Sequence, residues 1–182
     1  MRTRIWIATT AAFVALTAGS LMGQAQVTKE TVPGISNFSR VETTIACAGA
    51  TTPAAVATVK QMGYKSIINL RQASEAGADV EAEADAAKAA GITYVHLPFN
   101  TASPDPAVVD KFLAAVTAPA NQPVFVHCAS ANRASALWMV KRMLVDGWDA
   151  DRASTEAAAL GLTNAALKTF ALDYVSAHKK SL

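Results

Sequence analysis

Apolar and polar positions alternate along the chain in a pattern of short strands followed by helices. Apolar runs that are typical of strands occupy 41–48, 65–70, 92–98 and 124–126. Apolar positions recur at helical spacing in the segments 54–62, 79–90, 106–118, 133–145, 150–160 and 163–178. Strands that alternate with helices predict a three-layer α/β fold, in which a mostly parallel sheet is flanked by helices through right-handed crossovers.

The first 25 residues have the features of a secretory signal peptide. Arg2 and Arg4 precede an uncharged apolar stretch over 5–22, and residues 23–25 offer a small-x-small cleavage site. The alternative is a membrane anchor, although the stretch lies near the lower length limit for a span. We therefore expect residues 1–25 to be removed and the protein to be exported, periplasmic or secreted, without stable membrane association afterwards.

Beyond the signal, the chain divides into a lead-in and one domain. Residues 26–40 are polar and contain Pro33-Gly34, so we expect a flexible lead-in or a capping segment. Residues 41–182 are long enough for a single domain with its own core.

The charge balance excludes a nucleic-acid surface. The chain has 16 basic and 14 acidic residues, and two of the basic ones lie in the predicted signal, so the mature chain is formally neutral. The sequence contains no metal-ligand spacing and implies no cofactor, and it leaves the oligomeric state open.

The densest cluster of candidate chemistry follows the apolar run 124–126. His127 and Cys128 end the predicted strand, small and polar residues occupy 129–132, and Arg133 opens the next helix. Backbone N–H groups at a helix start favour a bound anion, and an arginine fork suits phosphate oxygens. The same positive field would stabilise a thiolate. These residues indicate an anion-binding loop with a nucleophile; the alternative is a buried structural cysteine near a surface arginine.

This stretch resembles the active loops of cysteine-dependent phosphatases and of rhodaneses. Phosphatases commonly place five residues between cysteine and arginine, whereas four separate Cys128 from Arg133, as in some rhodaneses. The chain resembles the phosphatase-like domain of beta-lactamase-hydrolase-like proteins, bacterial relatives of dual-specificity phosphatases, whose loop reads His-Cys-x-Ser-Gly-x-Arg-Ser/Ala. Segments 48–53, 67–71 and 94–98 also fit that family, so the resemblance covers roughly residues 35 to 178.

The resemblance implies a protein tyrosine phosphatase-like fold and a set of site residues. Cys128 would be the nucleophile, and Arg133 would bind phosphate oxygens together with the loop around it. That loop comprises His127, Ala129, Ser130, Ala131 and Asn132. The partner would be a small anionic substrate or a phosphorylated ligand.

Two positions depart from the pattern of that family. Ala131 stands where a loop glycine is expected, and alanine adopts a positive φ only at some cost. Ala134 follows Arg133, where phosphatases carry a Ser or Thr that helps the thiolate to leave. Ser135 and Ser130 are the candidates to replace that hydroxyl.

The sequence offers one candidate for the general acid. Asn100 lies nearest the end of the preceding strand and cannot supply a proton as a carboxyl group does. Asp105 is the only acid in 99–106 and is therefore the candidate, with helix capping as its competing role.

Residues outside the loop offer further candidates. Arg71 directly follows a predicted strand, so it would add positive charge beside the nucleophile with Glu75 orienting it; the alternative is a surface ion pair. The acidic residues of the helix at 79–90 are expected to face solvent; they are Glu81, Glu83 and Asp85. Cys47 either pairs with Cys128 in an oxidising compartment or is buried and inert.

Three functions remain compatible with the residues. The first is a phosphatase-like hydrolase in which Cys128 attacks phosphorus. The second is a rhodanese-like sulfurtransferase that forms a Cys128 persulfide and needs no general acid. The third is a catalytically weak module that binds an anion without turnover.

Overall fold

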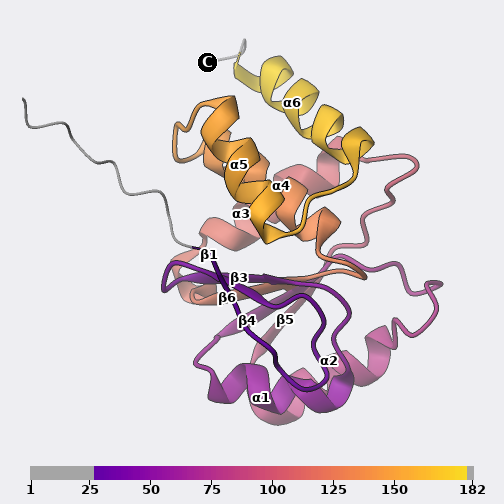
Figure 1. Cartoon of the computed structure of the whole chain (residues 1–182). Coiled ribbons are helices and arrows are strands. Elements are labelled where there is room, and N and C mark those ends of the chain that lie inside the picture. The colour runs from indigo at the N-terminus through magenta and orange to yellow at the C-terminus, as the bar shows by residue number, and fades with distance from the viewer. Residues whose placement is uncertain (1–26, 180–182) are drawn as a thin grey trace, which may run out of the picture.

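A computed structural model describes residues 27–179, which form one six-stranded sheet covered by helices (Figure 1). The sheet order is β1-β2-β3-β6-β4-β5. Strands β3, β6, β4 and β5 are parallel, whereas β1 and β2 are antiparallel to their neighbours. The strand bounds are β1 Val27–Lys29, β2 Ser39–Val41, β3 Ile45–Ala48, β4 Ser66–Asn69, β5 Thr93–His96 and β6 Val124–His127.

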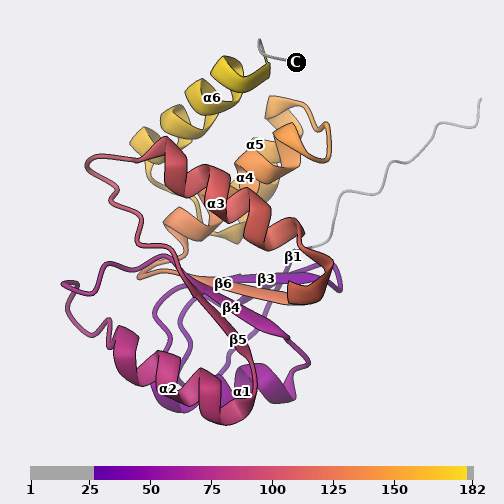
Figure 2. The same ribbon diagram turned by 180° about the vertical axis from the view of Figure 1, so that it is seen from behind.

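Helices cover both faces of the sheet, which confirms the three-layer α/β fold (Figures 1 and 2). On one face lie α1 Val56–Gln61, preceded by a 3-10 turn at Pro53–Ala55, and α2 Val80–Ala90. On the other face lie α3 Pro106–Thr117, α4 Asn132–Leu144, α5 Ala150–Leu160 and α6 Ala165–Lys179, with a 3-10 turn at Pro119–Asn121 before β6. The helices fall within a few residues of the predicted segments, because apolar residues at helical spacing over a long segment are a strong signal for a helix.

The central strand β6 separates two apolar cores. Val124 and Val126 point into the larger core, which is shared with α3 to α6, and Phe125 points into the smaller core under α1 and α2. Side chains alternate between the faces of a strand. Cys128 therefore continues on the larger-core side, and His127 lies on the α2 side.

The segment predicted as a flexible lead-in is part of the sheet. Residues 27–41 contain β1 and β2, and the buried Phe38 stacks on Phe125 with ring centroids 6.1 Å apart. The strand predicted over 41–48 is divided by a turn at Glu42, whose φ is +58°. A flexible lead-in and an unbroken first strand are therefore not what the structure shows, whereas a capping segment, the alternative for 26–40, agrees with β1 and β2 at the sheet edge. Strands of three and four residues carry too few apolar residues to show a period of two. The predicted signal peptide lies outside the described residues.

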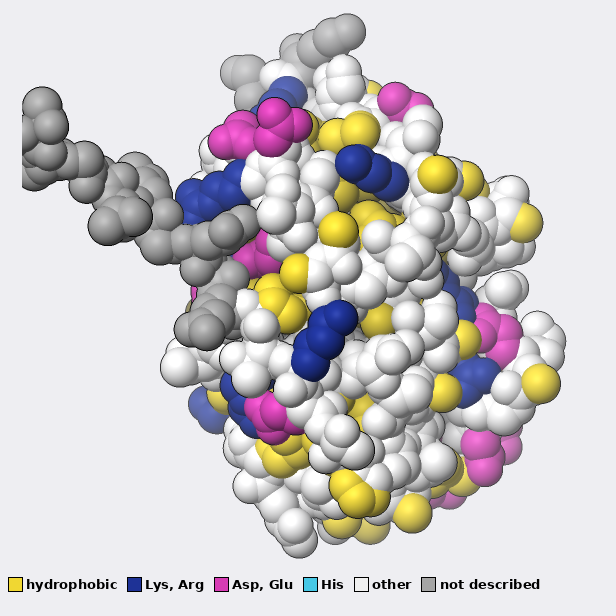
Figure 3. Space-filling model, in the orientation of Figure 1, with side chains coloured by type: hydrophobic (Ala, Val, Ile, Leu, Met, Phe, Trp, Pro, Cys, Tyr) yellow, Lys and Arg dark blue, Asp and Glu magenta, His cyan; other side chains and the backbone are white. Residues whose placement is uncertain are grey.

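The surface visible in Figure 3 carries both signs of charge. Lys and Arg side chains lie scattered on this face among Asp and Glu, rather than in one basic patch. Within residues 27–179, no helix is long and apolar enough to cross a membrane. Over the same range, no group of three His, Cys, Asp or Glu side chains is placed to hold a metal ion.

Candidate active site

Cys128 lies where β6 ends and the loop to α4 begins. Its backbone N–H donates to the Ala48 carbonyl at 3.2 Å, and the residue is fully buried. The loop carbonyl of Ala129 accepts a bond from Ala50 N at 3.0 Å. Gly49 permits this contact, because a Cβ there would lie 2.4 Å from the Ser36 hydroxyl and 3.2 Å from the Ala129 carbonyl. The predicted strand, loop and helix are thus confirmed, with the thiol at the carboxyl end of the central strand.

Arg133 joins three loop segments at that end of the sheet. Its NH1 group donates to the carbonyls of Leu70 at 3.0 Å and Phe99 at 3.1 Å, and its NH2 group donates to Glu75 at 2.8 Å. A second bond from NH1 to Glu75 makes that ion pair bidentate. Among residues 27–179, no oxygen accepts a bond from Nε of Arg133. The Cys128 side chain also interacts with the guanidinium, so the nucleophile and the arginine meet in one place.

The electrostatics of Arg133 keep it charged. Burial alone would lower the pKa of Arg133, but Glu75 and the nearby Cys128 sulfur more than offset this and raise it above its usual value. Burial would likewise raise the pKa of Glu75, but bonds from Arg133, the Gln72 N–H and Arg71 lower it from 4.5 to about 2. Glu75 is therefore a fixed anion that orients the arginine.

Arg71 is buried and shapes the loop that carries Glu75. Its guanidinium donates to the carbonyls of Ala76 at 2.7 Å and Gly77 at 2.6 Å and to Glu75 at 3.3 Å. It is thus no surface ion pair, since only 4% of the residue is exposed. Arg71 and Arg133 both donate to Glu75, so this carboxylate links the two arginines. A direct contact of Arg71 with substrate stays a prediction.

His127 and Glu83 correct two expectations from the sequence. The His127 ring lies on the α2 face, opposite the Cys128 side chain, where its Nε2 is 2.8 Å from Glu83 Oε1. Both residues are fully buried, so Glu83 does not belong to a solvated face and the His127 ring does not line the anion loop. One feature of the sequence could have indicated that Glu83 is buried. Ala87 lies four residues after Glu83, on the same face of α2, and is also buried.

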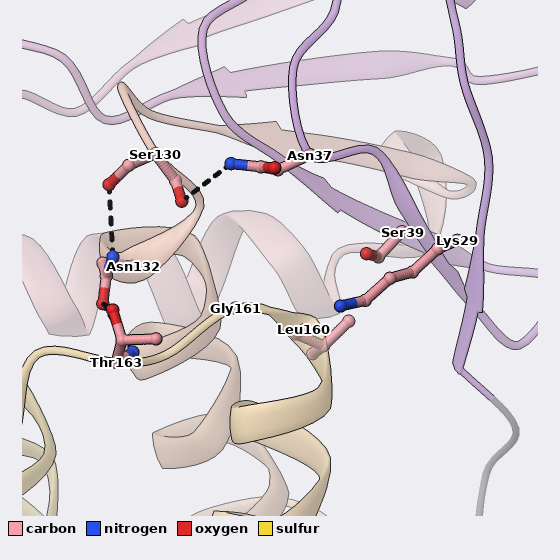
Figure 4. Close-up of a pocket in the computed structure, with 8 residues that line it drawn as sticks. All are labelled: Lys29, Asn37, Ser39, Ser130, Asn132, Leu160, Gly161 and Thr163. Atoms are coloured by element: carbon pink, nitrogen blue, oxygen red, sulfur yellow. Dashed lines mark hydrogen bonds between the residues drawn. The ribbon is translucent and has the colours of Figure 1, made fainter.

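The side chains of Ser130 and Asn132 are joined by a hydrogen bond and lie among the residues that line a pocket (Figure 4). Asn132 Oδ1 accepts bonds from the backbone N–H groups of Thr163 and Asn164, both at 2.8 Å, and so ties the loop to the start of α6. These side chains border a cavity of about 350 Å³ lined by Lys29, Asn37, Ser39, Ser130, Asn132, Leu160, Gly161 and Thr163. A contact of Ser130 or Asn132 with an anion in the loop stays a prediction.

The candidate hydroxyls and the candidate acid have structural partners. The buried Ser135 hydroxyl donates to the Ala131 carbonyl at 2.9 Å, and the Ser130 hydroxyl accepts from the Asn132 amide at 3.2 Å. Asp105 caps α3, because its Oδ1 accepts from Ala107 N at 2.9 Å, and the residue is exposed. The capping role is thus confirmed, whereas no contact among the described residues tests the general-acid role of Asp105.

The two cysteines are both free and buried. Cys47 lies in β3 and is paired in register with Val126 of β6. Burial raises the pKa of the Cys47 thiol above its usual range. These features agree with Cys47 as a small, inert core residue.

Ala131 occupies the strained position of the loop, with φ at +71°. Because this conformation costs alanine about 1–2 kcal/mol and glycine little, Ala131→Gly should not destabilise the fold and should gain up to ~1 kcal/mol. Ala136→Gly is the control, since Ala136 is equally buried but lies inside α4. Urea unfolding should show a loss of more than about 1 kcal/mol for the control. Equal losses for both variants would contradict a strained Ala131.

Comparisons with known proteins agree with this arrangement. The chain matches the family described as beta-lactamase hydrolase-like protein, phosphatase-like domain, over residues 37–145. No curated protein matches it.

Solved structures share its fold at low sequence identity. The P. aeruginosa protein TpbA is 22% identical, with 84% of this chain and 90% of that chain covered and a TM-score of 0.64. A Shewanella putrefaciens protein described as a DUF442 phosphatase is 24% identical, with 80% and 94% covered and a TM-score of 0.65. The core catalytic domain of the S. cerevisiae PP-IP phosphatase SIW14 is 21% identical, with 79% and 88% covered and a TM-score of 0.65.

These likenesses confirm the protein tyrosine phosphatase-like fold. The family match spans more than half of the chain and includes the whole segment from β3 through α4. The protein therefore belongs to the phosphatase-like domain family of beta-lactamase hydrolase-like proteins.

Proposed function

We propose that the protein is an exported, cysteine-dependent phosphatase. The Cys128 thiolate attacks phosphorus, an S–P bond forms, and the ester P–O bond breaks. Water then attacks phosphorus, the S–P bond breaks, and phosphate leaves with the oxygen of that water while the thiolate is restored. Arg133 and the loop N–H groups stabilise the negative charge on the phosphoryl oxygens in both steps.

The orientation of Arg133 carries this proposal. Its guanidinium is fixed by Glu75 and two backbone carbonyls, and it also interacts with the Cys128 side chain. A buried arginine held in this way is prepared to bind an oxyanion without reorganising. Ligands of two relatives support a small anionic or phosphorylated substrate: a cysteine-to-serine variant of TpbA was solved with pTyr, and SIW14 with citrate.

The exposed, helix-capping Asp105 suggests substrates whose leaving group needs little protonation, such as aryl phosphates. We expect Asp105→Asn to lower phosphate release from an aryl phosphate by less than about threefold, because asparagine also caps helices. Asp149→Asn is a matched control, since Asp149 caps α5 in the same manner through Arg152 N. A loss of about 10²-fold in Asp105→Asn alone would instead make Asp105 the general acid.

A sulfurtransferase is the second candidate, favoured by the four-residue spacing from Cys128 to Arg133 and by the capping role of Asp105. In that reaction Cys128 attacks the sulfane sulfur of thiosulfate, sulfite leaves, and the persulfide sulfur passes to cyanide as thiocyanate.

A parallel assay separates these functions. The purified protein, reduced, is given an aryl phosphate in one reaction and thiosulfate with cyanide in the other, beside a Cys128→Ser variant. We expect phosphate release that depends on Cys128. Thiocyanate without phosphate would overturn the proposal in favour of sulfur transfer, and neither product from a folded protein would indicate an anion-binding module.

A further inference from the structure

Two fully buried ionisable side chains lie behind the candidate nucleophile and take no part in the proposed reaction. Glu83 of α2 and His127 of β6 are both 0% exposed, with 2.8 Å between Oε1 and Nε2. The alignment of these atoms is not that of a regular hydrogen bond, and within residues 27–179 the other ring nitrogen of His127 has no partner. Burying such groups is costly, and an apolar pair would fill the same space at lower cost.

The other oxygen of Glu83 extends this contact to two more strands. Glu83 Oε2 accepts a bond from the Asn69 amide at 2.7 Å and one from the Tyr94 hydroxyl at 3.3 Å. Asn69 ends β4, Tyr94 lies in β5, and His127 ends β6. One carboxylate on α2 therefore touches the three adjacent parallel strands that lead into the site.

Two of these strands, β4 and β6, supply a part of the candidate active site just beyond the Glu83 contact. After β4, Asn69 Oδ1 accepts the Arg71 N–H at 2.7 Å, and the Leu70 carbonyl accepts Arg133. After β6 comes Cys128, and the His127 carbonyl accepts the Leu70 N–H at 2.9 Å. The connection from Glu83 to the thiol and to the arginine is thus one residue long on each strand.

We propose that Glu83 is a positioning residue, which acts through His127 to hold Cys128 in register with Arg133. A buried pair of ionisable groups that costs stability is retained in some proteins because it specifies one arrangement of the groups around it. The bond to Asn69 holds the end of β4, and the contact with His127 holds the end of β6. The same Glu83 carboxylate therefore fixes the position of the Cys128 sulfur relative to the Arg133 guanidinium. The kinetic part of this inference rests on the proposed phosphatase function, whereas the placement of the loop does not.

The test compares Glu83→Gln with Glu81→Gln, which makes the same change at an exposed position of α2. The first measurement is the ¹H–¹⁵N spectrum of the full chain. We expect Glu83→Gln to move the amide resonances of Cys128 and Arg133, and Glu81→Gln to leave them in place. If Glu83→Gln does not fold, Glu83→Asp is used instead, because it keeps the charge but moves the carboxylate away from His127 and Asn69. It should shift the amide resonances of Cys128 and Arg133 in the same way. Unmoved resonances in a folded Glu83 variant would overturn the inference whether or not the protein hydrolyses phosphate esters.

Kinetics supply the second measurement and separate positioning from stability. In Glu83→Gln, kcat on an aryl phosphate should fall about 10- to 100-fold, because a small misplacement of a nucleophile is costly, while KM changes by less than about threefold. Once His127→Asn is present, adding Glu83→Gln should cost less than about twofold more, since both act through one contact. Additive losses would contradict action through His127. If the wild type releases no phosphate, the proposed function fails and the spectra alone decide the role of Glu83.

Discussion

Arg133→Lys should lose about 10²- to 10³-fold in phosphate release, because lysine keeps the charge but not the fork that meets both the loop and the phosphoryl oxygens. A single ammonium cannot reach the Leu70 and Phe99 carbonyls and Glu75 while also binding substrate. We also expect the fold to lose about 1–3 kcal/mol, since those acceptors lose a charged donor. Steady-state phosphate release and urea unfolding measure the two effects.

Arg40→Lys is the control for that change, because Arg40 is half-buried on another part of the sheet and pairs with Glu30. It should leave activity within about twofold and stability within about 1 kcal/mol. Activity of Arg133→Lys within about threefold of the wild type would contradict the role assigned to the guanidinium.

The pH dependence of stability gives a second view of the same ion pair. Since Glu75 titrates near 2 in the folded protein and near 4.5 otherwise, its stabilising contribution is complete above 4.5 and is lost as the pH falls towards 2. In Arg133→Lys the pKa of Glu75 should lie closer to 4.5. The loss of unfolding free energy between pH 4.5 and 2 should therefore be smaller in the variant than in the wild type, which urea unfolding at several pH values would show.

Arg142→Met should be the most destabilising change away from the site, with a loss of about 3–5 kcal/mol. Arg142 is 4% exposed and donates to both oxygens of Glu156, at 2.7 and 3.0 Å, and to Glu42 at 2.7 Å. Its guanidinium also lies over the rings of Trp138 and Trp148, 4.6 and 4.1 Å from their centroids. Without it, the buried Glu156 keeps, among the side chains that the structure describes, only the Trp138 indole as a donor.

A double variant separates loss of the arginine from the unpaired carboxylate. Arg142→Met with Glu156→Gln should recover part of the stability, because a neutral amide still accepts from Trp138 and carries no buried charge. Arg152→Met is the control, since Arg152 lies over Trp148 but is partly exposed, and it should lose about 1 kcal/mol or less. A loss below about 1 kcal/mol in Arg142→Met, or no recovery in the double variant, would contradict this account.

The sequence predicted the parts of the fold that depend on neighbours along the chain. The strand, loop and helix around Cys128 were legible because an apolar run, small polar residues and a helical pattern follow one another within 124–144. The positive φ of Ala131 was also foreseen, because the resemblance placed a glycine there. Local pattern thus located the anion loop and the order of the layers.

Contacts between distant segments were not predictable in the same way. Glu83 looked like part of an acidic surface because its partner His127 lies 44 residues later, in a strand on the other side of the crossover. Phe38 and its short strands looked like a lead-in because their partner Phe125 lies in β6. The role of Glu75 was predicted only with Arg71, whereas its bidentate partner is Arg133.

The most direct test of the central claim is to look for the phosphocysteine itself. The reduced protein is mixed with an aryl phosphate, the reaction is quenched rapidly, and the peptides are examined by mass spectrometry beside Cys128→Ser and Cys47→Ser. We predict one phosphoryl group on Cys128 in the wild type and in Cys47→Ser, and none in Cys128→Ser. Phosphate release without any phosphorylated Cys128, or label that persists in Cys128→Ser, would contradict the account.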